Sequence, residues 1–174
     1  MTTRSPHLSR RHFLRTTGKV AATALPVWFL NQEADATPQA TSESTPPSDP
    51  IRIGLVGCGG MGRGDARNAK RFGKIVAICD VDENHLNDAK AKDFPAADGY
   101  GDFRAILDRQ DVDVVICGTV DHWHTLVSMG AMKAGKDVYC EKPLTLTIDE
   151  GKRLVKVQRE TGRVLQTGTQ QRSS

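Results

Sequence analysis

The feature that most constrains the fold of this chain is a glycine pattern set between two apolar runs. The first run, residues 51–56, leads directly into a G-x-G-x-x-G motif at residues 57–62. A polar segment of helix length follows, and a second apolar run, Ile75–Cys79, ends at Asp80. This order predicts a strand, a tight turn, a helix and a second strand.

Each glycine of the motif has a physical role in a dinucleotide-binding unit. Gly57 permits the tight turn, Gly59 lets a pyrophosphate approach the backbone, and Gly62 lets the helix pack closely on the strand. The phosphates are expected on the free N–H groups at the helix N-terminus, so Gly60 and Met61 join the candidate cofactor-binding residues. Glycines alone could equally form a flexible loop, but the flanking strand and helix patterns favour nucleotide binding.

The acidic residue after the second strand, Asp80, is a candidate ribose-binding carboxylate. It would accept hydrogen bonds from ribose hydroxyls and repel a 2'-phosphate, which favours NAD over NADP as the cofactor. The alternative role for Asp80 is to cap the next helix, but Asp82 can fill that role.

The remaining chain alternates buried runs with amphipathic segments, which predicts an α/β fold with a doubly wound, Rossmann-type parallel sheet in the order 3-2-1-4-5-6. Further helices are expected over 82–92, 103–108, 121–134 and 148–160, and further strands over 112–117, 138–140 and from 164. Gly135 and Gly162 are expected to end helices, and Asp121 to be an N-cap. The last helix is expected to place on one face Ile148, Gly151, Leu154, Val155 and Gln158.

The charge of the chain is concentrated at its N-terminus. The net charge is +3, from 24 basic and 21 acidic residues, and residues 1–36 hold five of the basic and two of the acidic ones. The rest is therefore neutral (24 − 5 = 19 basic, 21 − 2 = 19 acidic), so nothing predicts a nucleic-acid partner.

Residues 1–36 have the pattern of a twin-arginine signal peptide. A basic segment holds Arg10 and Arg11, an apolar run covers Val20–Leu30, and Ala34-Asp35-Ala36 resembles an A-x-A cleavage site. The run is too short for a permanent membrane span. We expect recognition by the twin-arginine export machinery and a periplasmic or otherwise exported protein; the alternative is an amphipathic N-terminal helix.

Residues 37–50 contain four prolines and no large apolar side chain, so they are expected to form a disordered linker, with the Rossmann domain over 51–174. The four cysteines, Cys58, Cys79, Cys117 and Cys140, are expected at carboxyl ends of strands, lining a crevice. We expect free, buried thiols rather than two disulfides. No pair has C-x-x-C spacing, so no metal is expected.

The tripeptide Glu141-Lys142-Pro143 follows the fifth predicted strand directly, which places Lys142 at the edge of the sheet where a nicotinamide would project. A lysine there can exchange a proton with a substrate hydroxyl while hydride moves to or from the ring. The alternative is a solvated lysine in a surface turn.

Several segments together resemble the Gfo/Idh/MocA oxidoreductase family, which includes glucose-fructose oxidoreductase and inositol dehydrogenase. They are G-C-G-G-M-G, the strand end at Asp80, T-V-D-H-W-H, A-G-K-D-V-Y-C-E-K-P-L and Q-T-G-T-Q-Q-R, within residues 51–172. The resemblance implies NAD- or NADP-dependent chemistry on sugars, inositols or related polyols. It also implies a catalytic role for Lys142, a nicotinamide-side role for Glu141 and a site role for His124, although a packed, satisfied histidine is the alternative for His124.

The family continues into a C-terminal substrate domain that is absent from this chain, so we expect a truncated product that binds nucleotide and is inactive alone. An oligomer is possible in the full-length form. Two other functions stay open: an NAD-dependent glycosidase of the same fold, which oxidises a ring hydroxyl transiently so that elimination cleaves the glycosidic bond, and a non-catalytic nucleotide-binding module.

Overall fold

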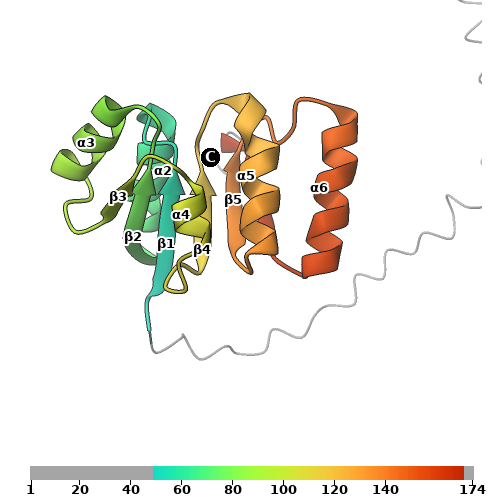
Figure 1. Ribbon diagram of the computed structural model, residues 1–174, viewed down its shortest axis with the longest axis horizontal. Helices are drawn as coiled ribbons and strands as arrows, with labels where there is room; N and C mark the ends of the chain where they lie inside the picture. The colour runs from blue at the N-terminus through green and yellow to red at the C-terminus, as the bar shows by residue number, and fades with distance from the viewer. Residues whose placement is uncertain (1–48, 171–174) are drawn as a thin grey trace, which may run out of the picture. The chain divides into compact units, whose positions relative to one another are not determined.

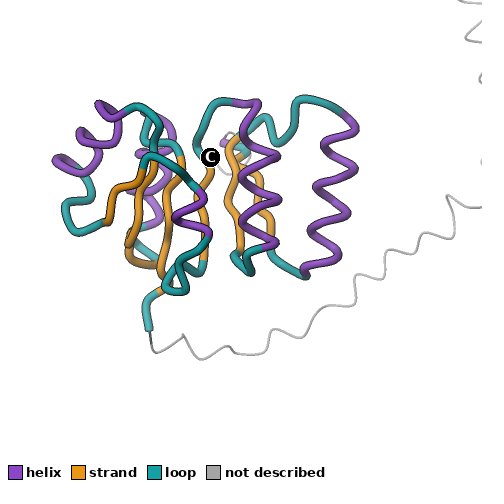
Figure 2. The backbone as a smooth tube through the Cα atoms, viewed as in Figure 1, coloured by secondary structure: helices purple, strands orange, loops and turns teal. Residues whose placement is uncertain are grey.

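The computed structural model describes residues 49–170, and the predicted leader and most of the predicted linker lie outside them. These residues form a parallel sheet flanked by helices (Figures 1 and 2). The strands are β1 (Ile51–Val56), β2 (Gly73–Cys79), β3 (Asp98–Tyr100), β4 (Val114–Cys117), β5 (Asp137–Glu141) and β6 (Leu165–Gly168). The helices are α2 (Gly60–Ala69), α3 (Glu83–Lys92), α4 (Arg104–Leu107), α5 (Asp121–Lys133) and α6 (Ile148–Thr161).

The strand order is β3-β2-β1-β4-β5-β6 with every pairing parallel, which confirms the predicted doubly wound topology. The order reverses between β1 and β4, which pair directly. In open α/β sheets, ligands bind beyond the carboxyl ends of the strands at this reversal. The fold therefore places the glycine turn after β1 at the expected binding edge.

Two layers of helices cover the sheet, because alternate residues of each strand point to opposite faces. One core cluster joins the sheet to Ala66 of α2 and Ala89 of α3. The other joins it to Ile106 of α4, Val127 of α5 and Leu154 of α6. In Figure 1 α5 and α6 accordingly lie in front of the sheet and α2 behind it. Each fully buried aliphatic side chain of such a core contributes about 2 kcal/mol.

Helix ends follow local rules, with two corrections to the predictions. The C-cap of α6 is Gly162 with φ 65°, as expected, and Thr147 with Glu150 forms a capping box at its start. Asp121 is not an N-cap, because the helix already includes it and Val120 precedes it in the capping position.

The predicted buried face of α6 is also partly wrong. Ile148 and Val155 are 83% and 49% exposed, while Leu154 and Val157 are buried. Ile148 is the first residue of the helix, at the very end of the element, and the face that packs is centred on Leu154 instead.

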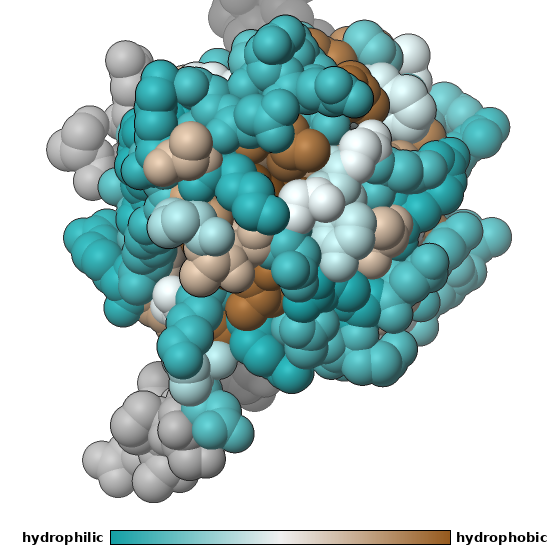
Figure 3. Space-filling view, turned by 60° about the vertical axis from the view of Figure 1, so that its left-hand side comes forward, coloured by the Kyte–Doolittle hydropathy of each residue, from teal (hydrophilic) through white to brown (hydrophobic). Residues whose placement is uncertain are grey.

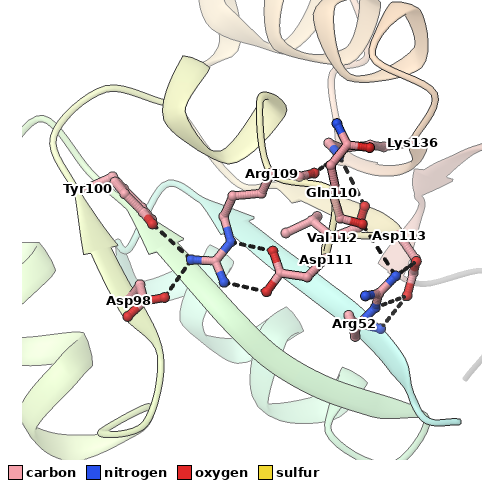
Figure 4. A network of polar contacts seen from close by, with 9 residues as sticks. All are labelled: Arg52, Asp98, Tyr100, Arg109, Gln110, Asp111, Val112, Asp113 and Lys136. Atoms are coloured by element: carbon pink, nitrogen blue, oxygen red, sulfur yellow. Dashed lines mark hydrogen bonds and ion pairs between the residues drawn. The ribbon is translucent and has the colours of Figure 1, made fainter.

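A polar network holds the amino-terminal ends of the strands (Figure 4). The guanidinium of Arg109 donates to both carboxylate oxygens of Asp111, at 2.8 and 2.5 Å, and also to Asp98 and Tyr100 of the edge strand β3. Lys136 is 4% exposed and donates to the carbonyl oxygens of Arg109 and Val112. This network ties the short edge strand to the body of the sheet, at the end opposite the glycine turn.

Candidate functional site

The glycine turn after β1 is shaped by contacts that only glycine allows. Gly57 has φ +95°, its N–H donates to the carbonyl of Cys79 at 2.8 Å, and a Cβ there would lie 2.5 Å from the carbonyl oxygen of Gly118. A Cβ at Gly62 would collide with the carbonyl oxygen of Gly57. Close packing between strand and helix therefore requires glycine at both positions.

The start of α2 is open on its outer side. A Cβ at Gly59 or Gly60 would meet nothing within 4 Å, Met61 is 42% exposed, and no side chain caps the helix. The first N–H groups of a helix have no intrahelical partner and attract anions. The open backbone and uncapped N–H groups thus fit the pyrophosphate of a dinucleotide.

Asp80 also has a structural role that the sequence did not indicate. Its carboxylate accepts hydrogen bonds from the N–H groups of Cys58 at 2.7 Å and Asp82 at 2.9 Å, and its side chain is 13% exposed. Asp80 therefore fastens the glycine turn to the end of β2. A carboxylate has about four acceptor positions, so two bonds leave capacity for ribose hydroxyls. Asp82 caps α3 by accepting from Asn84 at 2.8 Å, as predicted.

The Glu141-Lys142-Pro143 segment leaves β5 at the carboxyl-terminal edge of the sheet. The glycine turn leaves β1 at the same edge, because β1, β4 and β5 are parallel neighbours. Glu141 is 3% exposed, whereas Lys142 is exposed. The N–H of Lys142 donates to Glu141 Oε2 at 3.3 Å. The lysine side chain is thus exposed at the surface, whereas the glutamate that precedes it is buried.

His124 corresponds to the packed alternative. It is 1% exposed, and its ring nitrogens face the carbonyl oxygens of Pro143 at 2.7 Å and Thr119 at 3.1 Å. Through Pro143 it holds the backbone next to Lys142, so its contribution to the site is one of positioning.

A carboxyl group that the sequence reading missed lies next to Glu141. Asp65, on α2, has its pKa raised to about 6 by burial and by the charge and hydrogen bonding of Glu141. No pattern around Asp65 marked it, because the contact joins two elements far apart in the sequence.

The four cysteines are free and buried, as expected, but they belong to the core rather than to the wall of an open crevice. The fold also brings Cys117, His124 and Cys140 together, with ligand-type atoms within 4.8 Å of one another. A hydrogen bond from Cys140 lowers the pKa of the Cys117 thiol. Both ring nitrogens of His124 already face carbonyl oxygens, so we assign no metal to this cluster.

A hollow of about 590 Å³ lies elsewhere, beside the first residues of β2 and β3, with Phe94 and Pro95 in its lining. Figure 3, which brings the β3 side forward, shows hydrophobic atoms mainly in recesses between hydrophilic side chains. Because the hollow is at the amino-terminal end of these strands, it is separate from the candidate site. No helix within residues 49–170 is long and apolar enough to cross a membrane.

Residues 51–169 match the oxidoreductase family Gfo/Idh/MocA, which has an NAD-binding Rossmann fold, and the chain belongs to this family. The match covers the whole sheet, including the glycine turn and the Lys142 edge. The class defined by the fold is thus a nicotinamide-dinucleotide-binding oxidoreductase domain.

Among curated proteins, the chain is 36% identical over 159 residues to glycosyl hydrolase family 109 protein 2 from Shewanella sp., covering 81% of this chain and 35% of the relative. It is 33% identical over 122 residues to inositol 2-dehydrogenase from Burkholderia multivorans, covering 68% and 36%. The chain therefore spans about a third of the length of these relatives.

Solved structures agree on the fold. The WlbA dehydrogenase from Bordetella pertussis, in complex with NADH and UDP-GlcNAcA, aligns with TM-score 0.66 and 29% identity over 71% of this chain and 39% of that one. KijD10, a 3-ketoreductase from Actinomadura kijaniata in complex with NADP and TDP-benzene, aligns with TM-score 0.61 and 30% identity over 68% and 37%. These neighbours include both an NADH and an NADP complex.

Proposed function

We propose that this chain is the cofactor-binding part of an exported oxidoreductase that moves hydride between NAD and a hydroxyl carbon of a sugar or cyclitol. The observation that carries the proposal is the meeting of three elements at one sheet edge: the open glycine turn, Asp80 and the exposed Lys142. Two relatives, an inositol 2-dehydrogenase and a dehydrogenase in complex with NADH and a sugar nucleotide, support the substrate class.

In this proposal the residues divide the work. The N–H groups at the start of α2 hold the pyrophosphate, and Asp80 accepts from the ribose. Bound NAD supplies the hydride acceptor or donor. Lys142 exchanges a proton with the substrate oxygen as the C–H bond forms or breaks, and Glu141 lies beneath it on the nicotinamide side. Substrate contacts would come from a further domain.

The test is a comparison of Lys142→Ala with Lys152→Ala, which removes an exposed lysine from α6. In the full-length protein that contains this chain, Lys142→Ala should reduce polyol-dependent NADH formation at least about a hundredfold, the usual scale of general acid–base catalysis. NADH affinity should stay within about twofold, because the lysine serves the proton and not the phosphates. Near-normal turnover by Lys142→Ala would exclude the proposed role.

A second candidate is a glycosidase that uses bound NAD transiently. It is favoured by the longer matches to glycosyl hydrolase family 109 proteins, 81–82% of this chain, against 66–70% for the inositol dehydrogenases. Release of nitrophenol from nitrophenyl glycosides without net NADH would select this candidate. Net NADH formation with free polyol would select the dehydrogenase, and nucleotide binding without either reaction would indicate a binding module.

A further inference from the structure

Two carboxyl groups lie next to the proposed nicotinamide edge, and neither forms a salt bridge with a described residue. Asp65 comes from α2 and Glu141 from the end of β5, and Asp65 Oδ2 and Glu141 Oε1 are buried with no hydrogen-bond partner among the described residues. After burial, the charge and side-chain hydrogen bonding of Glu141 are the causes that raise the pKa of Asp65, which places the two carboxyl groups next to each other. Two bare carboxylates cannot hydrogen-bond, so the arrangement is satisfied only when one of them carries a proton.

The surroundings leave the pair little room, and none of the salt bridges within residues 49–170 includes Asp65 or Glu141; the ammonium of Lys142, next in the chain, is exposed. A Cβ at Gly168 of β6 would lie 2.5 Å from Glu141 Oε1 and 2.7 Å from the hydroxyl of Tyr139, so backbone closes one side of the pair. The nearest cations on α2, Arg63 and Arg67, are both paired with Asp93. The remaining oxygen of Glu141 accepts the backbone N–H of Lys142.

The titratable groups that act on Asp65 are few. Glu141 acts through charge and hydrogen bonding, and burial of Asp65 has the largest effect, so the pKa of Asp65 is raised to about 6. Burial raises the pKa of the Tyr139 hydroxyl most, and the charges of Asp65 and Glu141 raise it further, so Tyr139 lies near the pair. The buried His124 belongs to α5, which covers the opposite face of the sheet.

We infer that Asp65 and Glu141 share one proton and that this pair makes the preference of the site for oxidised over reduced NAD depend on pH. The redox part of this inference rests on the proposed function, because it places the nicotinamide beside Glu141. The shared proton itself is a property of the chain alone.

The reason is the charge of the nicotinamide ring, which is positive in NAD⁺ and neutral in NADH. A pair that shares a proton has one negative charge, and a pair that has lost it has two. The second charge attracts the oxidised ring and not the reduced one. NAD⁺ should therefore bind relatively better above pH 6 than below it. By linkage, its binding should also release the proton from the pair.

The experiment measures the dissociation constants of NAD⁺ and NADH between pH 5 and pH 8 by calorimetry. In the wild type, the ratio Kd(NADH)/Kd(NAD⁺) should rise about threefold to tenfold across this range. Asp65→Asn donates to Glu141 without titrating, and should keep the ratio nearly constant. Glu160→Gln, which removes an exposed carboxylate of α6, should behave as the wild type. Asp65→Ser, another neutral donor, replaces the asparagine variant if that variant folds poorly.

A separate readout, carboxyl ¹³C NMR without nucleotide, tests the shared proton. The Asp65 carboxyl should titrate near pH 6 in the wild type. Titration of Asp65 with the ordinary aspartate pKa of about 4 would overturn the shared proton. If Kd(NADH)/Kd(NAD⁺) rose with pH in Asp65→Asn as much as in the wild type, the redox preference would be overturned. Absence of nucleotide binding at every pH would overturn the proposed function together with the redox preference, while the NMR titration would still decide the proton.

Discussion

At the scale of single residues, Asp80 holds the glycine turn, and any test of its proposed ribose contact has to leave that role in place. Its carboxylate accepts from the backbone of Cys58 and Asp82, so removing the side chain would loosen the glycine turn as well as any ribose contact. A test of cofactor choice therefore has to remove the charge while keeping an acceptor atom in place.

Asp80→Asn removes the charge and keeps one acceptor oxygen, so it retains one of the two backbone hydrogen bonds that the carboxylate accepts from Cys58 and Asp82. We expect wild type to bind NAD more tightly than NADP, because a 2'-phosphate would place a second anion beside the carboxylate. The substitution should reduce the ratio Kd(NADP)/Kd(NAD) about tenfold, equivalent to about 1.4 kcal/mol. Calorimetry measures both constants, and Asp82→Asn is the control, since asparagine can still cap α3. Wild type that binds NADP as tightly as NAD would contradict the assignment.

Asp65 makes a prediction about stability that needs no cofactor. Because its pKa is raised from 3.8 to about 6, the folded chain holds the proton more tightly than the unfolded chain. This contribution is complete below about pH 4 and is lost as the pH rises through about 6. Asp65→Asn should remove that loss and be more stable than the wild type at pH 7.5, by about 1 kcal/mol after allowance for partial exposure.

Urea unfolding at pH 5 and pH 7.5 measures the difference. Glu160→Gln is again the matched control, because its carboxylate is exposed and its loss should leave the free energy of unfolding nearly unchanged at both values. Equal stability of Asp65→Asn and wild type at pH 7.5 would show that the pair costs nothing when ionised.

At the scale of elements, α2 is distinctive because one of its glycines is closely packed and another faces open space. Gly62 is buried where the helix meets the turn and β4, whereas Gly64 faces open space. Both interrupt a helix in which alanine would be intrinsically better by about 1 kcal/mol. The local packing therefore decides whether an added methyl group stabilises or destabilises the fold at each position.

Gly62→Ala and Gly64→Ala form a matched pair for this point. The first places a Cβ against the carbonyl oxygen of Gly57 and should destabilise the chain by about 3 kcal/mol or more, because backbone has to move. The second should be neutral or stabilising by about 0.5–1 kcal/mol. Thermal unfolding compares them, and a tolerated Gly62→Ala would show that the helix does not pack as closely as described.

At the scale of the whole molecule, the proposal joins export to cofactor use. Residues 1–36, outside the described part, have the pattern of a leader whose route carries folded protein. A cofactor loaded before export would then have to stay bound, because an exported enzyme has no obvious nucleotide pool. We propose that the full-length enzyme retains NAD through many turnovers and is reoxidised by a second substrate, which recovery of empty wild-type enzyme would contradict.

The leader itself can be tested by replacing Arg10 and Arg11 together with lysine. Charge is unchanged, but a twin-arginine receptor reads the arginine pair, so the precursor should remain in the cytoplasm. Cell fractionation measures its distribution, and Arg4→Lys, a change outside the pair, should leave export unchanged. Unchanged delivery of the double variant would indicate another route.

Local sequence patterns were enough to predict the glycine turn, the parallel topology and the places where Asp80 and Lys142 leave the sheet. These features follow from local backbone rules and from periodicity, which act over a few residues at a time. Even so, the sequence assigned the N-cap of α5 to Asp121, which is the first residue of the helix, and it misplaced the buried face of α6, because caps and packed faces depend on neighbouring elements.

The contacts between side chains of different elements became visible only in the folded chain. It placed Asp65 of α2 against Glu141 of β5, and it gathered Cys117, His124 and Cys140 into one buried cluster. No local pattern encodes such contacts, since they depend on how a helix packs on a sheet. The ionisation of Asp65 and the burial of His124 are consequences of that packing, and they could be described only once the fold had brought these groups out of water.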